Sequence, residues 1–280
     1  GDAVIIEDHP SLQLGRDQDF TLEVRIRAEA TPDVAIFGNK DWDSGLNPGF
    51  VFSFEYPNGP AWKVNIGDGN QRADANGFDG VADGQWHTLS CSFDRDGMMR
   101  LYTDGVFSAE EDISFIEDID VGNGWYAGSD IFEAYSYMGA IAEIRFWQDI
   151  LSEEVIGNWH CSALDATHPQ WSSLQGHWAL TEGAGMQANN SVGEELTGAI
   201  QGATWNAPEG VIAFDYSNTP RIVDVAATAL DHMCLNIDPN WELDGISWVD
   251  GCNSSDIERL GRNTIKTNLF PNPGTDAFQI

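Results

Sequence analysis

The chain has 280 residues, of which 42% are hydrophobic and 11% aromatic, so it can bury a core as one large or two modest domains. This composition excludes a disordered or collagen-like chain. Acidic residues outnumber basic ones 45 to 13, which gives a formal net charge of -32. We therefore expect no nucleic-acid partner and no membrane insertion, and we favour metal cations and uncharged ligands as partners.

Strands of alternating polarity dominate the first part of the chain. Apolar residues occupy every second position in several runs: Phe20, Leu22, Val24, Ile26 and Ala28; Phe50, Phe52 and Phe54; Trp62, Val64 and Ile66; Leu89, Cys91 and Phe93. In the first run, Thr21, Glu23, Arg25 and Arg27 alternate with them, which predicts a half-buried strand. Clusters of Gly, Asn and Asp between the runs supply hairpin turns, so we predict an all-β, antiparallel sandwich. Ser152, followed by two glutamates, is the clear helix start.

Two motifs carry a family resemblance. Residues 83–105, DGQWHTLSCSFDRDGMMRLYTDG, resemble the laminin-G-like, concanavalin A-like jelly roll. Residues 139–152, spaced G-x-I-x-x-I-x-x-W-x-x-x-L-S, are similar to pentraxins. The resemblance implies a jelly-roll β-sandwich.

Residues 174–206 resemble the opening strands of the same family, although they follow its final strand. They either begin a second, truncated repeat or complete one sandwich, residues 1–210, in permuted order. We favour the permuted order, because too little chain follows for a second jelly roll. It predicts that residues 174–205 pair with the N-terminal strand.

The C-terminal part changes in character. Residues 211–262 contain an amphipathic helix pattern and an L-D-G turn, and they resemble the closing segment of secreted alkaline-phosphatase-superfamily phosphodiesterases. No counterpart of the catalytic centre of those enzymes is found here. Residues 263–280, with L-F-P-N-P, look like a linker and the start of a type IX secretion sorting domain, which implies a secreted or cell-surface protein of a Bacteroidetes-type bacterium.

The four cysteines allow three disulfide connectivities. Cys234 with Cys252 is the first pair to test, because the loop between them contains a proline and a turn. Cys91 alternates with apolar residues and is expected to be a buried thiol.

A calcium loop is suggested by Asn39, Asp41 and Asp43, three oxygen side chains at alternate positions before Gly45. The pentraxin resemblance implies calcium ligands in this loop and a second set in the loop before residue 139, where the chain offers Asp130. We expect one Ca²⁺ ion. The alternative is that these residues only build turns.

Aromatic side chains near these loops could stack on sugar rings. Trp42, Trp125 and Tyr126 lie in glycine-rich loops, and Arg72 and Asp74 could bond to sugar hydroxyls. Against this, large aromatic residues more often belong to cores or interfaces.

Catalysis by this chain has no sequence support. The E-x-D-x-x-E motif of jelly-roll glucanases is absent, as are G-x-S-x-G and H-E-x-x-H. The sequence predicts a noncatalytic, calcium-stabilised, lectin-like module of a secreted or cell-surface multidomain bacterial protein that binds carbohydrate. The alternatives are an accessory part of a secreted phosphodiesterase with an upstream catalytic domain, or a surface adhesion and assembly module.

Overall fold

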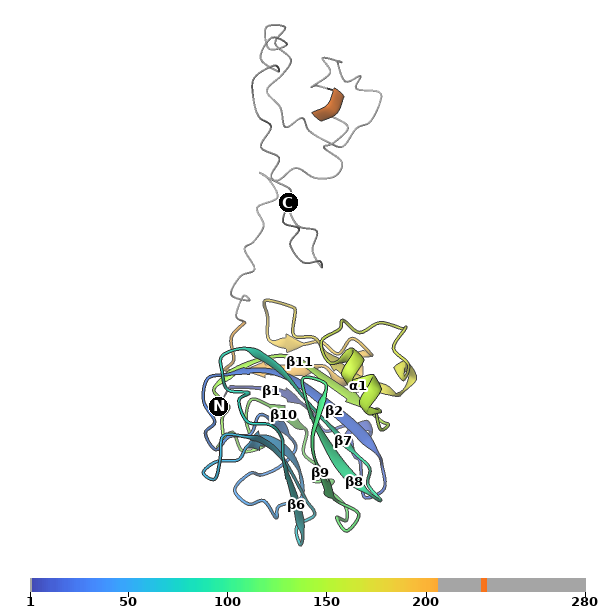
Figure 1. The fold of residues 1–280 in the computed structure, drawn as a ribbon. Coiled ribbons are helices and arrows are strands. Elements are labelled where there is room, and N and C mark those ends of the chain that lie inside the picture. The colour runs from blue at the N-terminus through green and yellow to red at the C-terminus, as the bar shows by residue number, and fades with distance from the viewer. Residues whose placement is uncertain (1, 206–227, 231–280) are drawn as a thin grey trace, which may run out of the picture. The chain divides into compact units, whose positions relative to one another are not determined.

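The computed structural model describes residues 2–205 and 228–230. The chain divides into two compact units, residues 1–207 and 208–280, and the first holds a sandwich of two antiparallel sheets (Figure 1). The all-β sandwich predicted from the alternating strands is therefore confirmed. In the second unit, the described residues 228–230 are helical.

Sheet A has eight strands and sheet B has six. In spatial order, sheet A contains β13 (Gln187–Ala188), β14 (Gly198–Gln201), β1 (Ala3–Ile6), β10 (Trp125–Ala127), β3 (Phe37–Gly38), β4 (Gly49–Phe54), β5 (Trp62–Gly67) and β6 (Arg72–Asn76). Sheet B contains β12 (Leu174–Trp178), β11 (Gly139–Trp147), β2 (Phe20–Ala28), β7 (Trp86–Phe93), β8 (Met98–Thr103) and β9 (Val106–Asp112). The helix α1 spans Glu153–Trp159, and short 3-10 helices span Pro10–Leu12, Trp171–Ser173 and Glu194–Leu196.

The strands after α1 complete both sheets. β14 pairs with β1, with Val4 opposite Ile200, and the other side of β1 pairs with β10. In sheet B, β12 extends the edge by pairing with β11, with Ile144 opposite Trp178. The predicted pairing of residues 174–205 with the N-terminal strand is thus present, in the permuted order.

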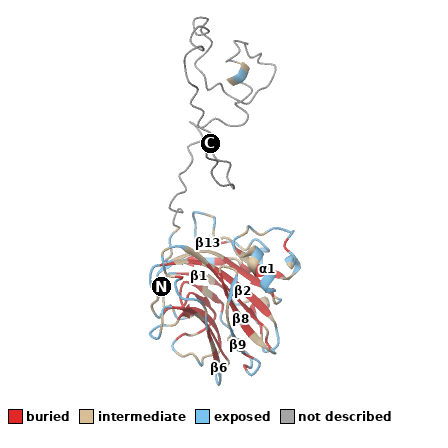
Figure 2. Ribbon diagram, viewed as in Figure 1, coloured by how far each residue is buried: buried red, intermediate tan, exposed pale blue. Residues whose placement is uncertain are grey.

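The core lies between the sheets and consists of the buried apolar side chains of the alternating strands. The strands that carry these buried residues are red in Figure 2. Phe20 of β2 stacks on Phe93 of β7, with ring centroids 4.2 Å apart, and both are fully buried. Asx turns and hydrogen bonds tie the loops to the strand ends. His87 at the start of β7, for example, bonds to Asp83 at 3.0 Å and Asp104 at 2.7 Å.

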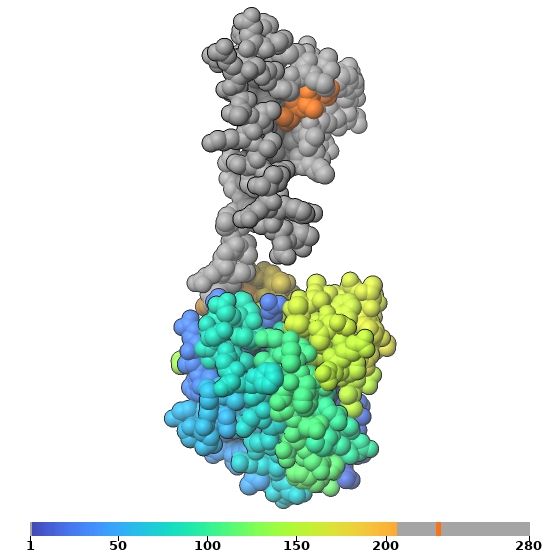
Figure 3. All heavy atoms as spheres, in the orientation of Figure 1, coloured from blue at the N-terminus to red at the C-terminus, as the bar shows by residue number. Residues whose placement is uncertain are grey.

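The outer face of β2 departs from the expected half-buried strand. Thr21 and Glu23 alternate with the apolar residues of β2, yet they are only 0% and 3% exposed. The segment after β11, which contains α1, covers them and forms the yellow-green lobe of Figure 3. Arg145 lies beneath this lobe, 3.5 Å from Glu23, and donates to the Trp159 carbonyl at 2.8 Å. The helix starts as predicted, with Ser152 accepting from the Val155 N–H.

Candidate functional site

The loop that joins β3 to β4 packs against the outer face of sheet A, the face turned away from the core. Its Trp42 packs with Val51 and is 8% exposed. The indole N–H donates to Oδ1 of Asp33 at 2.9 Å, and the Lys63 ammonium lies 4.8 Å from the ring centroid. A buried indole with a paired N–H offers no open surface for a sugar ring. In this structure Trp42 instead fixes the loop to the sheet.

The loop oxygens predicted to bind calcium accept hydrogen bonds from the protein. Oδ1 of Asn39 accepts from the Phe50 N–H at 2.8 Å. Oδ1 of Asp41 accepts from the Asp43 N–H at 3.0 Å, and the Tyr135 hydroxyl donates to Oδ1 of Asp43 at 3.4 Å. These bonds serve the turn-building role that is the alternative to metal binding.

Asp130 connects the loop between β10 and β11 to the β3–β4 loop. Its buried carboxylate accepts from the Ala134 N–H at 2.7 Å and the Trp42 N–H at 3.4 Å. Within residues 2–205 and 228–230, no group of three His, Cys, Asp or Glu side chains could hold a metal ion. The oxygens of Asn39 and Asp130 accept hydrogen bonds from backbone N–H groups, as the turn-building alternative requires. Calcium binding stays a prediction.

Two predicted ligand residues do meet on the outer face of sheet A, at its β6 edge. We call Lys63 and Asn65 of β5 with Arg72 and Asp74 of β6 the β5–β6 polar array. Asp74 accepts from Asn65 Nδ2 at 3.1 Å and lies 3.2 Å from Arg72 Nε and 3.8 Å from Lys63 Nζ. The side chains of Arg72 and Asp74 are 52% and 29% exposed. Lys63 and Asn65 were not predicted, although their alternation with Trp62, Val64 and Ile66 indicates an outward direction.

Lys40 is buried next to this array. Its side chain is 1% exposed, and Nζ donates to the Gly45 carbonyl at 2.9 Å. Burial lowers the pKa of Lys40 to about 7, although the nearby Asp74 carboxylate raises it. The nearby Arg72 guanidinium lowers it further. No sequence pattern indicates this burial, because Lys40 lies in a polar loop.

The remaining predicted ligand residues lie elsewhere. Trp125 is 0% exposed and packs in the core against Phe50 and Phe146, at centroid distances of 5.3 and 4.7 Å. Its prediction as a stacking platform is therefore wrong, because β10 turns this side chain inward. Tyr126, the next residue, points outward and is partly exposed. Four strand spacings separate β10 from β6, about 19 Å, so Tyr126 is not part of the β5–β6 polar array.

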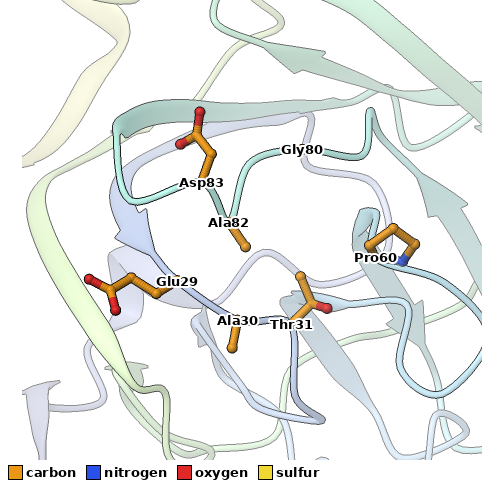
Figure 4. Close-up of a pocket in the computed structure, with 7 residues that line it drawn as sticks. All are labelled: Glu29, Ala30, Thr31, Pro60, Gly80, Ala82 and Asp83. Carbon is orange, nitrogen blue, oxygen red and sulfur yellow. The ribbon is translucent and has the colours of Figure 1, made fainter.

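A pocket of about 250 Å³ opens at one end of the sandwich. We call it the end pocket; its lining residues are Glu29, Ala30, Thr31, Pro60, Gly80, Ala82 and Asp83 (Figure 4). They come from the loop after β2, the β4–β5 loop and the β6–β7 loop. Sequence reasoning missed this site, because three segments far apart in the chain form it together.

Several predictions fall on residues that the structure does not describe. These are the Cys234–Cys252 pair, residues 263–280, and residues 211–262 apart from the helical 228–230. Among the described cysteines, Cys91 is a buried free thiol, as expected, and Cys161 is an exposed one. None of the described helices is long and apolar enough to cross a membrane.

Comparison with solved structures finds similar chains at low sequence identity. A Bacteroides ovatus protein named as a candidate carbohydrate-binding protein is 18% identical, with a TM-score of 0.56 over 73% of this chain and 58% of that one. This chain thus spans less than two thirds of that relative. A heptameric SAP-like pentraxin from Limulus polyphemus is 14% identical, with a TM-score of 0.43 over 56% of this chain and 74% of that one. The CBM40 module of a Ruminococcus gnavus IT-sialidase is 13% identical, with a TM-score of 0.45 over 58% of this chain and 95% of that one.

Comparison with curated proteins finds no match. Two family models match the chain. Residues 164–249 match a domain of unknown function, DUF4983, which does not support the expected phosphodiesterase segment. Residues 1–157 match the concanavalin A-like lectin/glucanases superfamily, as the motif resemblance implied. The chain therefore belongs to the concanavalin A-like lectin/glucanases superfamily.

Proposed function

We propose that this chain is a noncatalytic carbohydrate-binding module and that the β5–β6 polar array is its ligand surface. The observation that carries the proposal is the pair of partly exposed side chains Arg72 and Asp74 at the β6 edge, held in place by the buried Asn65. The fold is compatible with this role, and the Bacteroides ovatus relative is named for carbohydrate binding.

The chemistry of the array suits sugar hydroxyl groups. A hydroxyl both donates and accepts, so a carboxylate beside a guanidinium can bond to two adjacent hydroxyls. Asp74 is held by Asn65 and Arg72 before any ligand arrives. Such preorganisation reduces the side-chain entropy that is lost on binding.

A glycan array followed by calorimetry tests this proposal. We expect the double variant Arg72→Ala with Asp74→Ala to weaken the binding of the glycan that the unmodified chain selects. The matched control is Arg100→Ala with Glu110→Ala, which removes an exposed ion pair of 3.1 Å from sheet B. Equal binding by both double variants would refute the placement of the site, and no bound glycan at all would refute the function.

We propose that this protein is a secreted or cell-surface bacterial protein, with a type IX sorting signal after residue 263 and a catalytic domain upstream. The complete reading frame tests these points. Stabilisation by calcium is tested by melting curves in Ca²⁺, Mg²⁺ and chelator, and identical melting temperatures would remove calcium from the proposal.

A further inference from the structure

Backbone hydrogen bonds hold one loop of the end pocket, the β6–β7 loop, against the ends of strands β2 and β5. The Gly84 N–H donates to the Ala28 carbonyl at 2.9 Å, which holds the β6–β7 loop at the end of β2. The Gly77 N–H donates to the Trp62 carbonyl at 2.8 Å, which joins that loop to the start of β5. The pocket is therefore bordered by hydrogen-bonded backbone.

The walls combine small apolar groups with an unused hydroxyl. In Figure 4, the Ala82 methyl group, Thr31 and the Pro60 ring surround the space between the loops. The Thr31 hydroxyl makes no hydrogen bond to another described residue. A volume of about 250 Å³ lies below the range of drug-sized pockets, ~300–1,000 Å³, and suits one sugar ring.

Two exposed aromatic residues belong to the same loops. Tyr56, in the β4–β5 loop with Pro60, is 53% exposed, and Phe78, two residues before Gly80, is 45% exposed. Neither side chain lines the pocket itself, but large exposed aromatic residues in the same loops can contact the part of a ligand that extends beyond it. Neither residue is among the aromatic residues that the sequence predicts for this role, which are Trp42, Trp125 and Tyr126.

The rim of the pocket is acidic. Glu29 has no hydrogen-bond or ion-pair partner among the described residues, and no basic side chain lines the pocket. Asp83 remains a carboxylate, because the Gln85 N–H and His87 hold its pKa below the usual value. A ligand with an acid group would meet two carboxylates here, in a chain whose net charge is already -32.

We infer that the end pocket is a second sugar-binding site, selective for an uncharged sugar unit. It is distinct from the β5–β6 polar array. Arg72 starts β6, whereas the β6–β7 loop of the pocket follows Asn76 at its other end, about 13 Å along the strand.

Chemical-shift mapping of the ¹⁵N-labelled full chain tests this inference. The probes are neutral glucose, galactose, mannose, N-acetylglucosamine and their disaccharides, with N-acetylneuraminic acid as the acidic comparator. We expect at least one neutral sugar to shift the amides of Thr31, Gly80 and Ala82, and the acidic sugar to leave them unchanged.

Variants that fill the pocket make the test specific. Ala82→Leu and, from the opposite wall, Thr31→Tyr should each weaken the binding of that sugar about tenfold or more. Ala166→Leu makes the first substitution at an exposed loop position and should change nothing. The double variant Arg72→Ala with Asp74→Ala should keep the pocket shifts, which separates this site from the proposed ligand surface.

Three results would overturn the inference: no neutral sugar shifts the pocket amides, the acidic sugar binds there equally well, or both filled variants still bind. If the pocket variants bind normally and the array variant does not, only the proposed function survives. The reverse result would leave the end pocket as the sugar site.

Discussion

Replacing the buried Lys40 with methionine should stabilise the protein at neutral and acidic pH. Burial lowers the pKa of Lys40 from 10.5 to about 7, a difference equivalent to about 5 kcal/mol at 1.36 kcal/mol per pKa unit. Methionine has a similar length and no charge to desolvate. The variant loses the bond from Nζ to the Gly45 carbonyl, which costs about 1–3 kcal/mol. We therefore expect a net gain of about 2–4 kcal/mol below pH 7.

The gain should depend on pH in a defined direction. Below pH 7 the folded and unfolded chains both carry the proton on Lys40, so the folded state bears the full cost of the buried ammonium. Between pH 7 and 10.5 the folded chain has released this proton while the unfolded chain still holds it. The stability of the unmodified protein then rises with pH relative to the variant. From pH 6 to 9.5 the advantage of Lys40→Met should shrink by about 3 kcal/mol.

Urea unfolding of the 280-residue chain and of the variant at pH 6, 7.5 and 9.5, followed by tryptophan fluorescence, measures this difference. Lys63→Met is the control, because it removes the same charge from the outer face of sheet A at a side chain that still reaches solvent. A Lys40→Met advantage that is equal at pH 6 and 9.5 would refute the reasoning. So would a variant that is less stable at every pH.

Three further predictions address the fold. A chain of residues 1–160 lacks β12, β13 and β14, which complete both sheets. It should show neither cooperative melting nor a dispersed amide spectrum, whereas a chain of residues 1–205 should show both. Trp125→Ala should destabilise the protein by about 3–5 kcal/mol in urea, and glycan binding that vanishes without such a loss would restore Trp125 as a ligand residue. Burial alone would lower the pKa of His87, but hydrogen bonds to Asp104 and Asp83 raise this pKa overall. The stabilisation by His87 is therefore complete below its unfolded-state pKa, and it is lost as the pH rises through its folded-state pKa. His87→Gln should therefore lower the melting temperature more at pH 5.5 than at pH 8.5, and an equal loss at both would contradict this.

The sequence predicted what depends on local pattern. Alternation identified the inward faces of β2, β4 and β5, because side chains on a strand point to opposite sides at every step. Ser152 was recognised as a helix start for a similar reason, since an N-cap bonds within its own first turn. The order of the strands was obtained from the family resemblance, which placed residues 174–205 beside β1.

What surrounds each residue was decided only by the tertiary structure. Glu23 is buried although it lies on the polar side of its strand, because the chain after β11 returns to cover that side. Asp130 and Asn39 have the side chains of calcium ligands, yet their oxygens accept from backbone N–H groups of residues distant in sequence. The end pocket exists only where three loop segments meet. A residue's chemical type and strand face can be read from the local sequence, but its burial and its partners depend on contacts between distant segments, which the local pattern does not show.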